Sequence, residues 1–143
     1  MTMKPSIRAG FSLVEIMIAL AIVGLIMAVA IPKYNEFKEK GSRTATIASL
    51  RNFKGLIEQY SEDLEGKIPE KLEDLMTRPS NLDAELAPKW TGYLEGKKMP
   101  VDGWGRKFQY KPTPGAEHEY ELFSLGAKDG KQKGVKLDVW QDI

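Results

Sequence analysis

The stretch AGFSLVEIMIALAIVGLIMAVAIPKY, residues 9–34, decides the fold because it is a long apolar run with one carboxylate near its start. The segment from Phe11 to Ile31 would be about 30 Å long as an α-helix, which is enough to cross the hydrocarbon core of a bilayer. No residue from Ile16 to Pro32 is charged. We therefore predict a membrane-spanning helix over residues 11–32.

Glu15 is the ionisable side chain in this run. A charged carboxylate at the centre of a bilayer costs about 2.5–3.5 kcal/mol on insertion scales. Two opposite charges that share a low-dielectric site reduce each other's desolvation cost, and such a pair can also fix axial register. We therefore expect Glu15 to have a positively charged partner. The alternative is a carboxylate at the membrane surface that simply extends to water.

The first ten residues are short and basic, with Lys4 and Arg8 and no acidic residue. Basic residues keep their end of a membrane helix in the cytoplasm, so the remainder of the chain would cross the membrane. A secretory signal has an apolar region of roughly 7–15 residues followed by small residues. Here the apolar run is longer, and the small residues Ala9 and Gly10 precede it. A plain signal anchor is the simplest alternative.

The motif GFSLVEIMIAL, residues 10–20, resembles the class III signal of type IV pilins and type II secretion pseudopilins. The resemblance implies that a prepilin peptidase removes the leader, residues 1–10, by cutting between Gly10 and Phe11 on the cytoplasmic side. It also implies that the same enzyme methylates the new amine of Phe11. In the filament, the expected partner of Glu15 is the Phe11 amine of the adjacent subunit.

The sequence after the apolar run predicts that the helix continues, over about 50 residues from Phe11 to Leu64. Pro32 would bend this helix, and Gly41 with Ser42 could kink or interrupt it. A buried stripe is indicated by apolar residues that recur at spacings of three and four. These residues are Phe53, Leu56, Ile57, Tyr60 and Leu64.

The C-terminal part predicts a short helix and then strands. GKIPEKLEDLM, residues 66–76, is typical of a turn followed by a short helix that packs Leu72, Leu75 and Met76. Period-two alternation in residues 107–111 and 119–125 predicts strands, and a further strand is expected within residues 135–143. The fold class is therefore α+β and pilin-like, with a long N-terminal α-helix packed on a small C-terminal antiparallel sheet of three or four strands. Residues 33–143 would form the head, including the C-terminal half of the helix.

Four blocks of this head narrow the resemblance to the major pseudopilin of type II secretion, the general secretion pathway protein G family. They are Ile68-Pro69, Trp90–Leu94, Pro100–Gly105 and Phe123–Gly130. The family patterns are W-x-G-P-Y-L, P-x-D-P-W-G-x-P and F-S-L-G-A-D-G for the last three blocks. This chain departs from them in three places. The proline after glycine is missing in Thr91-Gly92-Tyr93, Gly103 replaces a proline, and Lys128 is an insertion.

The family's terminal loop implies a structural calcium site. Carried over by position, Leu125 would supply a carbonyl, and Asp129 and Asp138 would supply carboxylates. Calcium takes six to eight oxygen ligands. A third acidic position near Gly134-Val135 is absent, so Asp142 would have to substitute. Three lysines in the loop would repel a cation, namely Lys131, Lys133 and Lys136. The alternative is a loop closed by turn hydrogen bonds and packing.

The composition argues against an enzyme and against a nucleic-acid partner. The chain has no cysteine, and its single histidine, His118, is expected on a solvated hairpin without a nearby Ser or Cys nucleophile. The formal net charge is +1. Trp90, Trp104 and Trp140 could form a sugar-binding platform, but packing is the favoured interpretation. A net charge near zero gives no electrostatic footprint for nucleic acid.

The resemblance implies a bacterial inner-membrane prepilin, single pass with a periplasmic head, that assembles into a periplasmic pseudopilus filament. Its expected partners are further copies of itself, the prepilin peptidase, an inner-membrane assembly platform and minor pseudopilins. Growth of the filament would export folded proteins across the outer membrane. Two alternatives are a type IV pilin for adhesion, motility or DNA uptake, and a membrane-anchored periplasmic enzyme or binding module.

Overall fold

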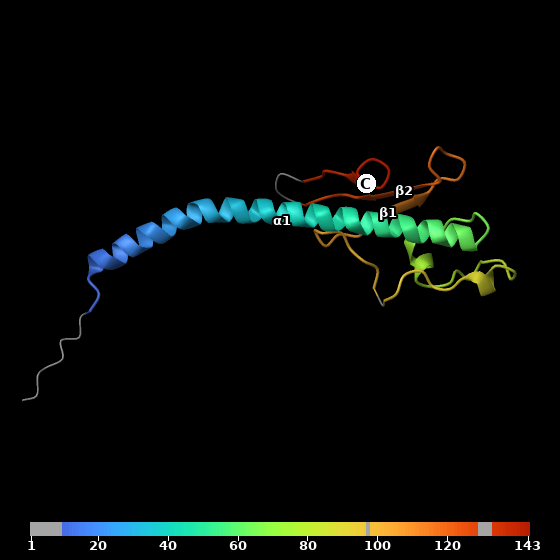
Figure 1. The fold of residues 1–143 in the computed structure, drawn as a ribbon, viewed down its shortest axis with the longest axis horizontal. Coiled ribbons are helices and arrows are strands. Elements are labelled where there is room, and N and C mark those ends of the chain that lie inside the picture. The colour runs from blue at the N-terminus through green and yellow to red at the C-terminus, as the bar shows by residue number, and fades with distance from the viewer. Residues whose placement is uncertain (1–9, 97, 129–132) are drawn as a thin grey trace, which may run out of the picture. The chain divides into compact units, whose positions relative to one another are not determined.

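The computed structural model describes residues 10–96, 98–128 and 133–143. Its main element is the α-helix α1, Leu13–Asp63, of 51 residues (Figure 1). The predicted range, Phe11 to Leu64, differs from the observed one by two residues at the start and one at the end. Contacts divide the chain into two compact units between Lys38 and Glu39. We predicted that the membrane-spanning segment ends at residue 32. The division into compact units does not test this boundary, which stays a prediction.

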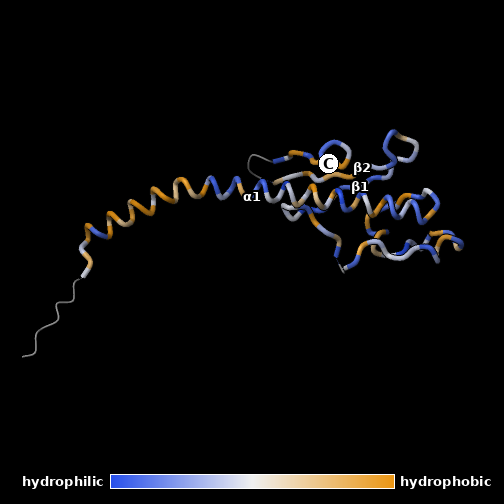
Figure 2. The backbone as a smooth tube through the Cα atoms, in the orientation of Figure 1, coloured by the Kyte–Doolittle hydropathy of each residue, from blue (hydrophilic) through white to orange (hydrophobic). Residues whose placement is uncertain are grey.

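The first half of α1 is apolar and exposed. Every large apolar side chain from Phe11 to Phe37 is exposed. Figure 2 shows that the first part of α1 is mostly coloured as hydrophobic. Within the described residues, α1 is the one helix long and apolar enough to span a bilayer. The helix continues through Pro32. Proline removes one backbone donor, and the remaining turns on both sides of it hold the helix.

The predicted interruption at Gly41 and Ser42 does not occur, because α1 is continuous there. Thr46 connects this part of the helix to a distant loop. Its hydroxyl donates a hydrogen bond to the Ser42 carbonyl at 2.8 Å and accepts one from the Gly103 amide at 2.9 Å. Glycine costs a helix only about 1 kcal/mol relative to alanine. A cost of this size does not by itself interrupt a helix of 51 residues.

The sheet has three antiparallel strands in the order β1-β2-β3, which are Gln109–Pro112, Tyr120–Ser124 and Leu137–Asp138. Gln109 pairs with Phe123, and Phe123 in turn pairs with Asp138. The turn that joins β1 to β2 contains Gly115 at a positive φ of 83°. The small antiparallel sheet and the long helix confirm the predicted α+β fold class.

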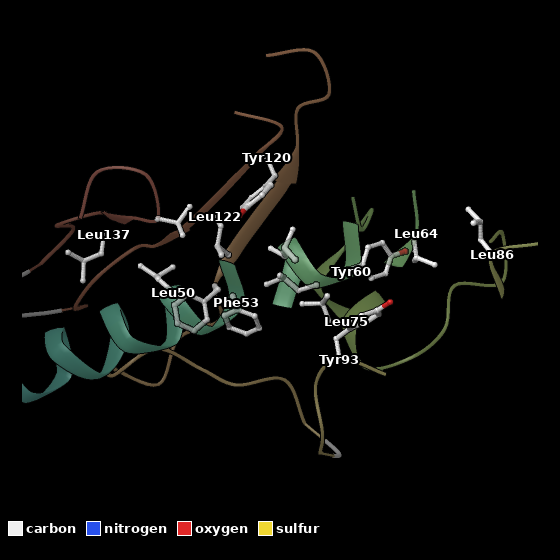
Figure 3. Packing of buried hydrophobic residues seen from close by; sticks show 14 residues of the cluster. Leu50, Phe53, Tyr60, Leu64, Leu75, Leu86, Tyr93, Tyr120, Leu122 and Leu137 are labelled. Atoms are coloured by element: carbon white, nitrogen blue, oxygen red, sulfur yellow. The ribbon is translucent and has the colours of Figure 1, made fainter. Parts of the chain in front are cut away.

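The core of the head lies between the C-terminal half of α1 and the sheet. Figure 3 shows Leu50, Phe53 and Tyr60 of the helix near Tyr120, Leu122 and Leu137 of the strand region. Four of the five residues predicted for the helix stripe are buried, and Leu56 is half-buried. The stripe is buried because residues three and four apart share one helix face.

Two short 3₁₀ helices complete the head, η1 at Leu72–Leu75 and η2 at Ala87–Lys89. The short helix predicted in residues 66–76 corresponds to η1. Leu72 and Leu75 are buried as expected, whereas Met76 is only half-buried. Leu75 also joins this region to the Trp90 block, because its carbonyl accepts the amides of Tyr93 and Leu94, each at 2.9 Å.

Candidate functional site: the helix N-terminus and the head junction

The residues predicted for processing lie in non-helical chain immediately before α1. Gly10 is exposed, and the Phe11 side chain is 83% exposed. A Cβ atom added to Gly10 would meet no heavy atom within 4 Å. The fold of the described residues therefore does not require a glycine there. If glycine is needed at this position, the reason lies in recognition by another protein.

Ser12 and Glu15 form a capping box at the start of α1. The Ser12 hydroxyl accepts the Glu15 amide at 3.2 Å, and Glu15 Oε2 accepts the Ser12 amide at 2.8 Å. These bonds satisfy two backbone donors that a helix start leaves without partners. Sequence reasoning missed Ser12, although the spacing Ser-x-x-Glu is itself a signal for this arrangement. Glu15 therefore has a local partner one residue from Phe11, and its pairing across subunits stays a prediction.

In the head, Asp102 joins two of the sequence blocks that carry the resemblance. Its side chain is buried, and Oδ1 accepts the amides of Trp104 at 3.0 Å and Arg106 at 2.8 Å. Oδ2 accepts the buried Ser124 hydroxyl at 2.6 Å, and Ser124 Oγ accepts the Gly126 amide at 3.0 Å. The 100–106 loop and the end of β2 are thus one hydrogen-bonded unit, which we call the head junction: Asp102, Trp104, Arg106, Ser124 and Gly126.

Gly103 fixes the head junction against α1. A Cβ atom at this position would lie 2.1 Å from the Ser42 carbonyl oxygen and 2.6 Å from its carbon. Only a residue without a side chain allows the two backbones to approach this closely. The Gly103 amide also donates to Thr46, which a proline could not do. The departure from the proline of the family pattern therefore has a physical reason in this chain.

The three residues predicted as calcium ligands have different outcomes. Asp129 lies outside the described residues. The Leu125 carbonyl accepts the Arg106 guanidinium at 3.3 Å. Asp138 is buried, and its Oδ2 lies 2.9 Å from Lys136 Nζ, while Oδ1 accepts the Trp140 amide at 3.0 Å. Burial opposes ionisation of Asp138, but the hydrogen bond and the charge of Lys136 lower its pKa below the usual value.

Asp142, the suggested substitute ligand, is also engaged. Its Oδ1 is 3.3 Å from the Arg43 guanidinium, and its Oδ2 accepts the Asp138 amide at 2.8 Å. Within the described residues there is no group of three or more His, Asp or Glu side chains that could hold a metal ion. This donor set does not fit a calcium cage, which takes six to eight oxygens. Calcium binding stays a prediction, and these contacts weigh against it.

The single histidine and the tryptophans take part in packing. His118 is exposed on the hairpin, and its ring stacks on Trp140 with centroids 4.1 Å apart. The Trp140 indole donates to the Tyr120 carbonyl at 2.8 Å. The Trp90 indole donates to the Asp74 carbonyl at 3.0 Å. The indoles of Trp90 and Trp140 therefore have hydrogen-bond partners in the fold. Trp104 packs against the core, and its buried indole nitrogen has no hydrogen-bond partner among the described residues.

The shifted pKa values of the head follow from burial. Burial raises the pKa of the Asp74 carboxyl, although the amides of Lys71 and Glu70 oppose this effect. Burial also raises the pKa of Tyr93 to about 12, and it raises the pKa values of Tyr110 and Tyr120 further. A raised phenol pKa makes a tyrosine a weaker acid at neutral pH. These shifts are those of packed side chains, and they do not indicate an activated nucleophile.

Two family models match different parts of this chain. Residues 6–31 match the prokaryotic N-terminal methylation motif. Residues 33–141, more than half of the chain, match the family described as Type II secretion system (T2SS), protein G. The chain belongs to the type II secretion system protein G family. The second match covers the head junction and the C-terminal half of α1.

Curated members of the protein G family agree over nearly the full length. The type II secretion system core protein G of Pseudomonas aeruginosa is 31% identical over 134 residues, covering 92% of each chain. The protein of the same name from Vibrio cholerae is 30% identical, covering 89% of this chain and 85% of its own. That from Klebsiella pneumoniae is 31% identical, covering 93% and 94%. These likenesses favour the secretion branch over a type IV pilin, as predicted.

The family is one of structural pseudopilins of the secretion system. Membership therefore agrees with a membrane-anchored chain whose long apolar N-terminal helix is exposed. The predicted family and function class are thus confirmed. The residues that the head uses to hold itself together were not predicted, namely Thr46, Asp102, Arg106 and Ser124. The blocks around Asp102 and Ser124 were recognised as patterns only.

Proposed function

We propose that this chain is made as a prepilin, is processed after Gly10, and assembles with copies of itself into a periplasmic pseudopilus that drives protein export. One observation carries the proposal. A helix of exposed apolar residues, with Glu15 at its start, continues into a head that buries its own core. An exposed apolar helix needs either lipid or neighbouring helices around it. When a subunit enters a filament, its helix leaves the lipid and packs against neighbouring helices.

The processing step rests on the methylation motif and on the exposure of Gly10 and Phe11. Removal of residues 1–10 by a prepilin peptidase creates a new amine on Phe11, and the same peptidase methylates it. This amine is a cation four residues before Glu15, the carboxylate of the apolar helix. The chain itself supplies the substrate peptide, and it makes and breaks no bond.

The assembly step pairs Glu15 with the Phe11 amine of the adjacent subunit. Within the chain, Glu15 accepts only the Ser12 amide among the contacts described, so one of its two carboxylate oxygens has capacity for a cation. A buried ion pair is favourable only when both partners are present, because either charge alone is strongly penalised. The pair would therefore select one axial register between neighbouring helices.

The remaining partners follow from the secretion role. Before assembly the helix spans the bacterial inner membrane, with Lys4 and Arg8 on the cytoplasmic side and the head in the periplasm. An inner-membrane platform would add subunits, and minor pseudopilins would join the filament. The head carries no catalytic group in this proposal. Its task is to fold stably and to pack against other heads.

Deletion of the gene in the native host tests the function. We expect specific secreted proteins to leave the medium and to accumulate in the periplasm, while surface pili remain. Re-expression of the wild-type chain should restore secretion. Loss of pili or twitching with normal secretion would overturn the proposal in favour of a type IV pilin. Intact secretion and intact pili would overturn both.

Mass spectrometry tests the processing step independently. Co-expression with an active prepilin peptidase should remove residues 1–10 and add one methyl group to Phe11. The matched control is co-expression with a catalytically inactive peptidase, which should leave the chain intact. An uncut chain beside the active enzyme, with a known prepilin cut in the same cells, would contradict the assignment of Gly10 and Phe11.

A further inference from the structure

Lys136 and Arg106 bind oxygen atoms near the C-terminal loop. The Lys136 ammonium is 2.9 Å from Asp138 Oδ2 and 4.0 Å from the centroid of the Phe123 ring. Phe123 and Asp138 are partners in the register of β2 and β3. Lys136 therefore contacts both strands beside the same pair. Its contact with Phe123 is a cation–π interaction, and that with Asp138 is a charge-assisted hydrogen bond.

Arg106 makes the second set of contacts. Its guanidinium donates from Nη1 to the Leu125 carbonyl at 3.3 Å and to the Gly126 carbonyl at 3.0 Å. Its backbone amide donates to the buried Asp102 carboxylate at 2.8 Å. The same residue thus holds the chain just after β2 and belongs to the head junction. A carbonyl that already accepts a guanidinium faces a like charge if a metal ion approaches it.

A second carboxylate of this region, that of Asp142, is also paired with a cation. Asp142 meets the Arg43 guanidinium of α1 at 3.3 Å, and its second oxygen accepts the Asp138 amide. Each described acidic side chain at the C-terminal end therefore has a cation from this chain within 4 Å. The expected family metal would have to displace Lys136 and Arg106 to reach Asp138 and Leu125.

We propose that Lys136 and Arg106 take the place of a calcium ion in this head, so that the C-terminal region is held by the chain's own cations and is stable without calcium. β3 has only two residues, Leu137 and Asp138, and its pairing with β2 supplies few backbone hydrogen bonds. Lys136 adds a fixed positive charge next to that short pairing. The proposal does not rest on the proposed filament function.

Thermal unfolding of the full-length chain in detergent micelles tests this proposal. The chain is dialysed against EGTA, and tryptophan fluorescence is followed with and without about 1 mM calcium chloride, a concentration at the weak end of extracellular calcium modules. We expect the wild-type Tm to be unchanged by calcium. We expect Lys136→Gln to lower the Tm by about 2–5 °C, the effect of losing a partly exposed charge pair in a small domain.

Two matched variants complete the test. Lys133→Gln removes the same charge from an exposed position of the same loop and should leave the Tm unchanged. Lys136→Arg keeps the cation and should retain a Tm close to the wild-type value. A rise in the wild-type Tm on addition of calcium would overturn the proposal. If Asp138→Asn did not show that rise, the calcium ion would be assigned to this loop. Equal Tm values for Lys136→Gln and Lys133→Gln would also overturn it.

Discussion

The two parts of α1 contain similar apolar residues in opposite surroundings. From Leu13 to Ile31 the large apolar side chains are all exposed, whereas Leu50, Phe53 and Ile57 are at most 1% exposed. In the head, the sheet and the 100–106 loop cover the helix. Before Lys38, the compact unit contains only the helix and the residues that precede it. An apolar surface of this extent is typical of a segment that contacts lipid or other protein chains.

This difference separates two kinds of mutational effect. A change in the apolar part of α1 should alter assembly and leave the stability of the head almost unchanged. A change in the head junction should alter folding stability directly. Variants that change the wrong property would show that the two parts are not independent.

The largest effect is expected from Glu15→Gln. Glutamine can still accept the Ser12 amide, so the capping box is kept, but the charge is lost. The neighbour's Phe11 amine would then be buried without a counter-charge, which costs about 3–5 kcal/mol and should reduce filament yield roughly 100-fold or more. Filaments released from the periplasm after the outer membrane is opened, quantified by immunoblot, provide the measurement.

The controls for Glu15→Gln are cleavage and head stability, and both should match the wild type. Glu15→Asp shortens the side chain but keeps the charge, and it should recover part of the filament yield. A normal filament yield from Glu15→Gln would contradict the pairing of charges. An unprocessed variant would instead assign Glu15 to recognition by the peptidase.

A large loss of head stability is expected from Gly103→Ala. The new Cβ would overlap the Ser42 carbonyl, and such overpacking costs about 1–3 kcal/mol. Gly103→Pro should cost about 1 kcal/mol more, because the hydrogen bond to Thr46 is also lost. Urea denaturation followed by tryptophan fluorescence measures both changes.

Gly55→Ala is the matched control for Gly103→Ala. Gly55 is an exposed helix residue, and a Cβ there would meet no atom within 4 Å. Alanine should therefore stabilise α1 by up to about 1 kcal/mol. Equal and unchanged stabilities for the two variants would show that the approach of Gly103 to Ser42 is not as close as described.

The fold was predictable where the relevant pattern is local. Spacings of three and four identified the buried stripe on α1, and alternation identified the strands, because both depend on neighbouring residues in the sequence. The approach of Gly103 to Ser42 depends on residues far apart in the chain. Sequence alone therefore identified Gly103 as a departure from the family pattern but could not explain it.

The candidate site shows the same division. Gly10, Phe11 and Glu15 could be predicted because they lie in one short motif with an unusual feature, a carboxylate in an apolar run. The capping role of Ser12 had an equally local signal that was missed. The link from Asp102 to Ser124 joins two sequence blocks, and no local rule connects them. Likewise, the sequence predicted that Lys136 would repel a metal ion, but it did not predict that Lys136 pairs with Asp138.

A smaller loss of head stability is expected from Ser124→Ala. The variant removes the donor to Asp102 Oδ2 and the acceptor of the Gly126 amide, and both partners stay buried. Leaving a buried polar group without its partner costs about 1–3 kcal/mol. Urea denaturation should detect this cost, with the exposed Ser80→Ala as the control. Equal stabilities would indicate that the head junction does not depend on this bond.

A local effect in the apolar part is expected from Ser12→Ala. Loss of an N-cap side chain costs about 1 kcal/mol, so the Glu15 amide should exchange with solvent about fivefold faster. Amide hydrogen exchange in detergent micelles measures this change, and Ser12→Asn, which preserves an N-cap acceptor, should remain close to the wild type. Faster amide exchange within the head would contradict the claim that the apolar part of α1 and the head are independent in stability.

The smallest expected effect is a pH dependence confined to the head. The pKa of Asp138 is lowered in the folded chain, so this group contributes stability above its unfolded pKa of about 3.9 and loses it as the pH falls through the folded value. The pKa of Asp74 is raised by burial, so its contribution is present below the unfolded pKa and is lost as the pH rises through the folded value.

Two substitutions should therefore respond to pH in opposite directions. The Tm loss caused by Asp138→Asn should shrink as the pH falls below the unfolded pKa of about 3.9 and through the lower folded value, because the wild-type carboxylate then becomes protonated. Relative to the wild type, Asp74→Asn should become more stable as the pH rises, because asparagine avoids the buried charge while its oxygen can still accept the amides of Glu70 and Lys71. Thermal scans at each pH measure both trends. If the two trends had the same sign, the pKa of Asp138 would not be lowered in the folded head. The ion pair between Lys136 and Asp138 would then not stabilise β3.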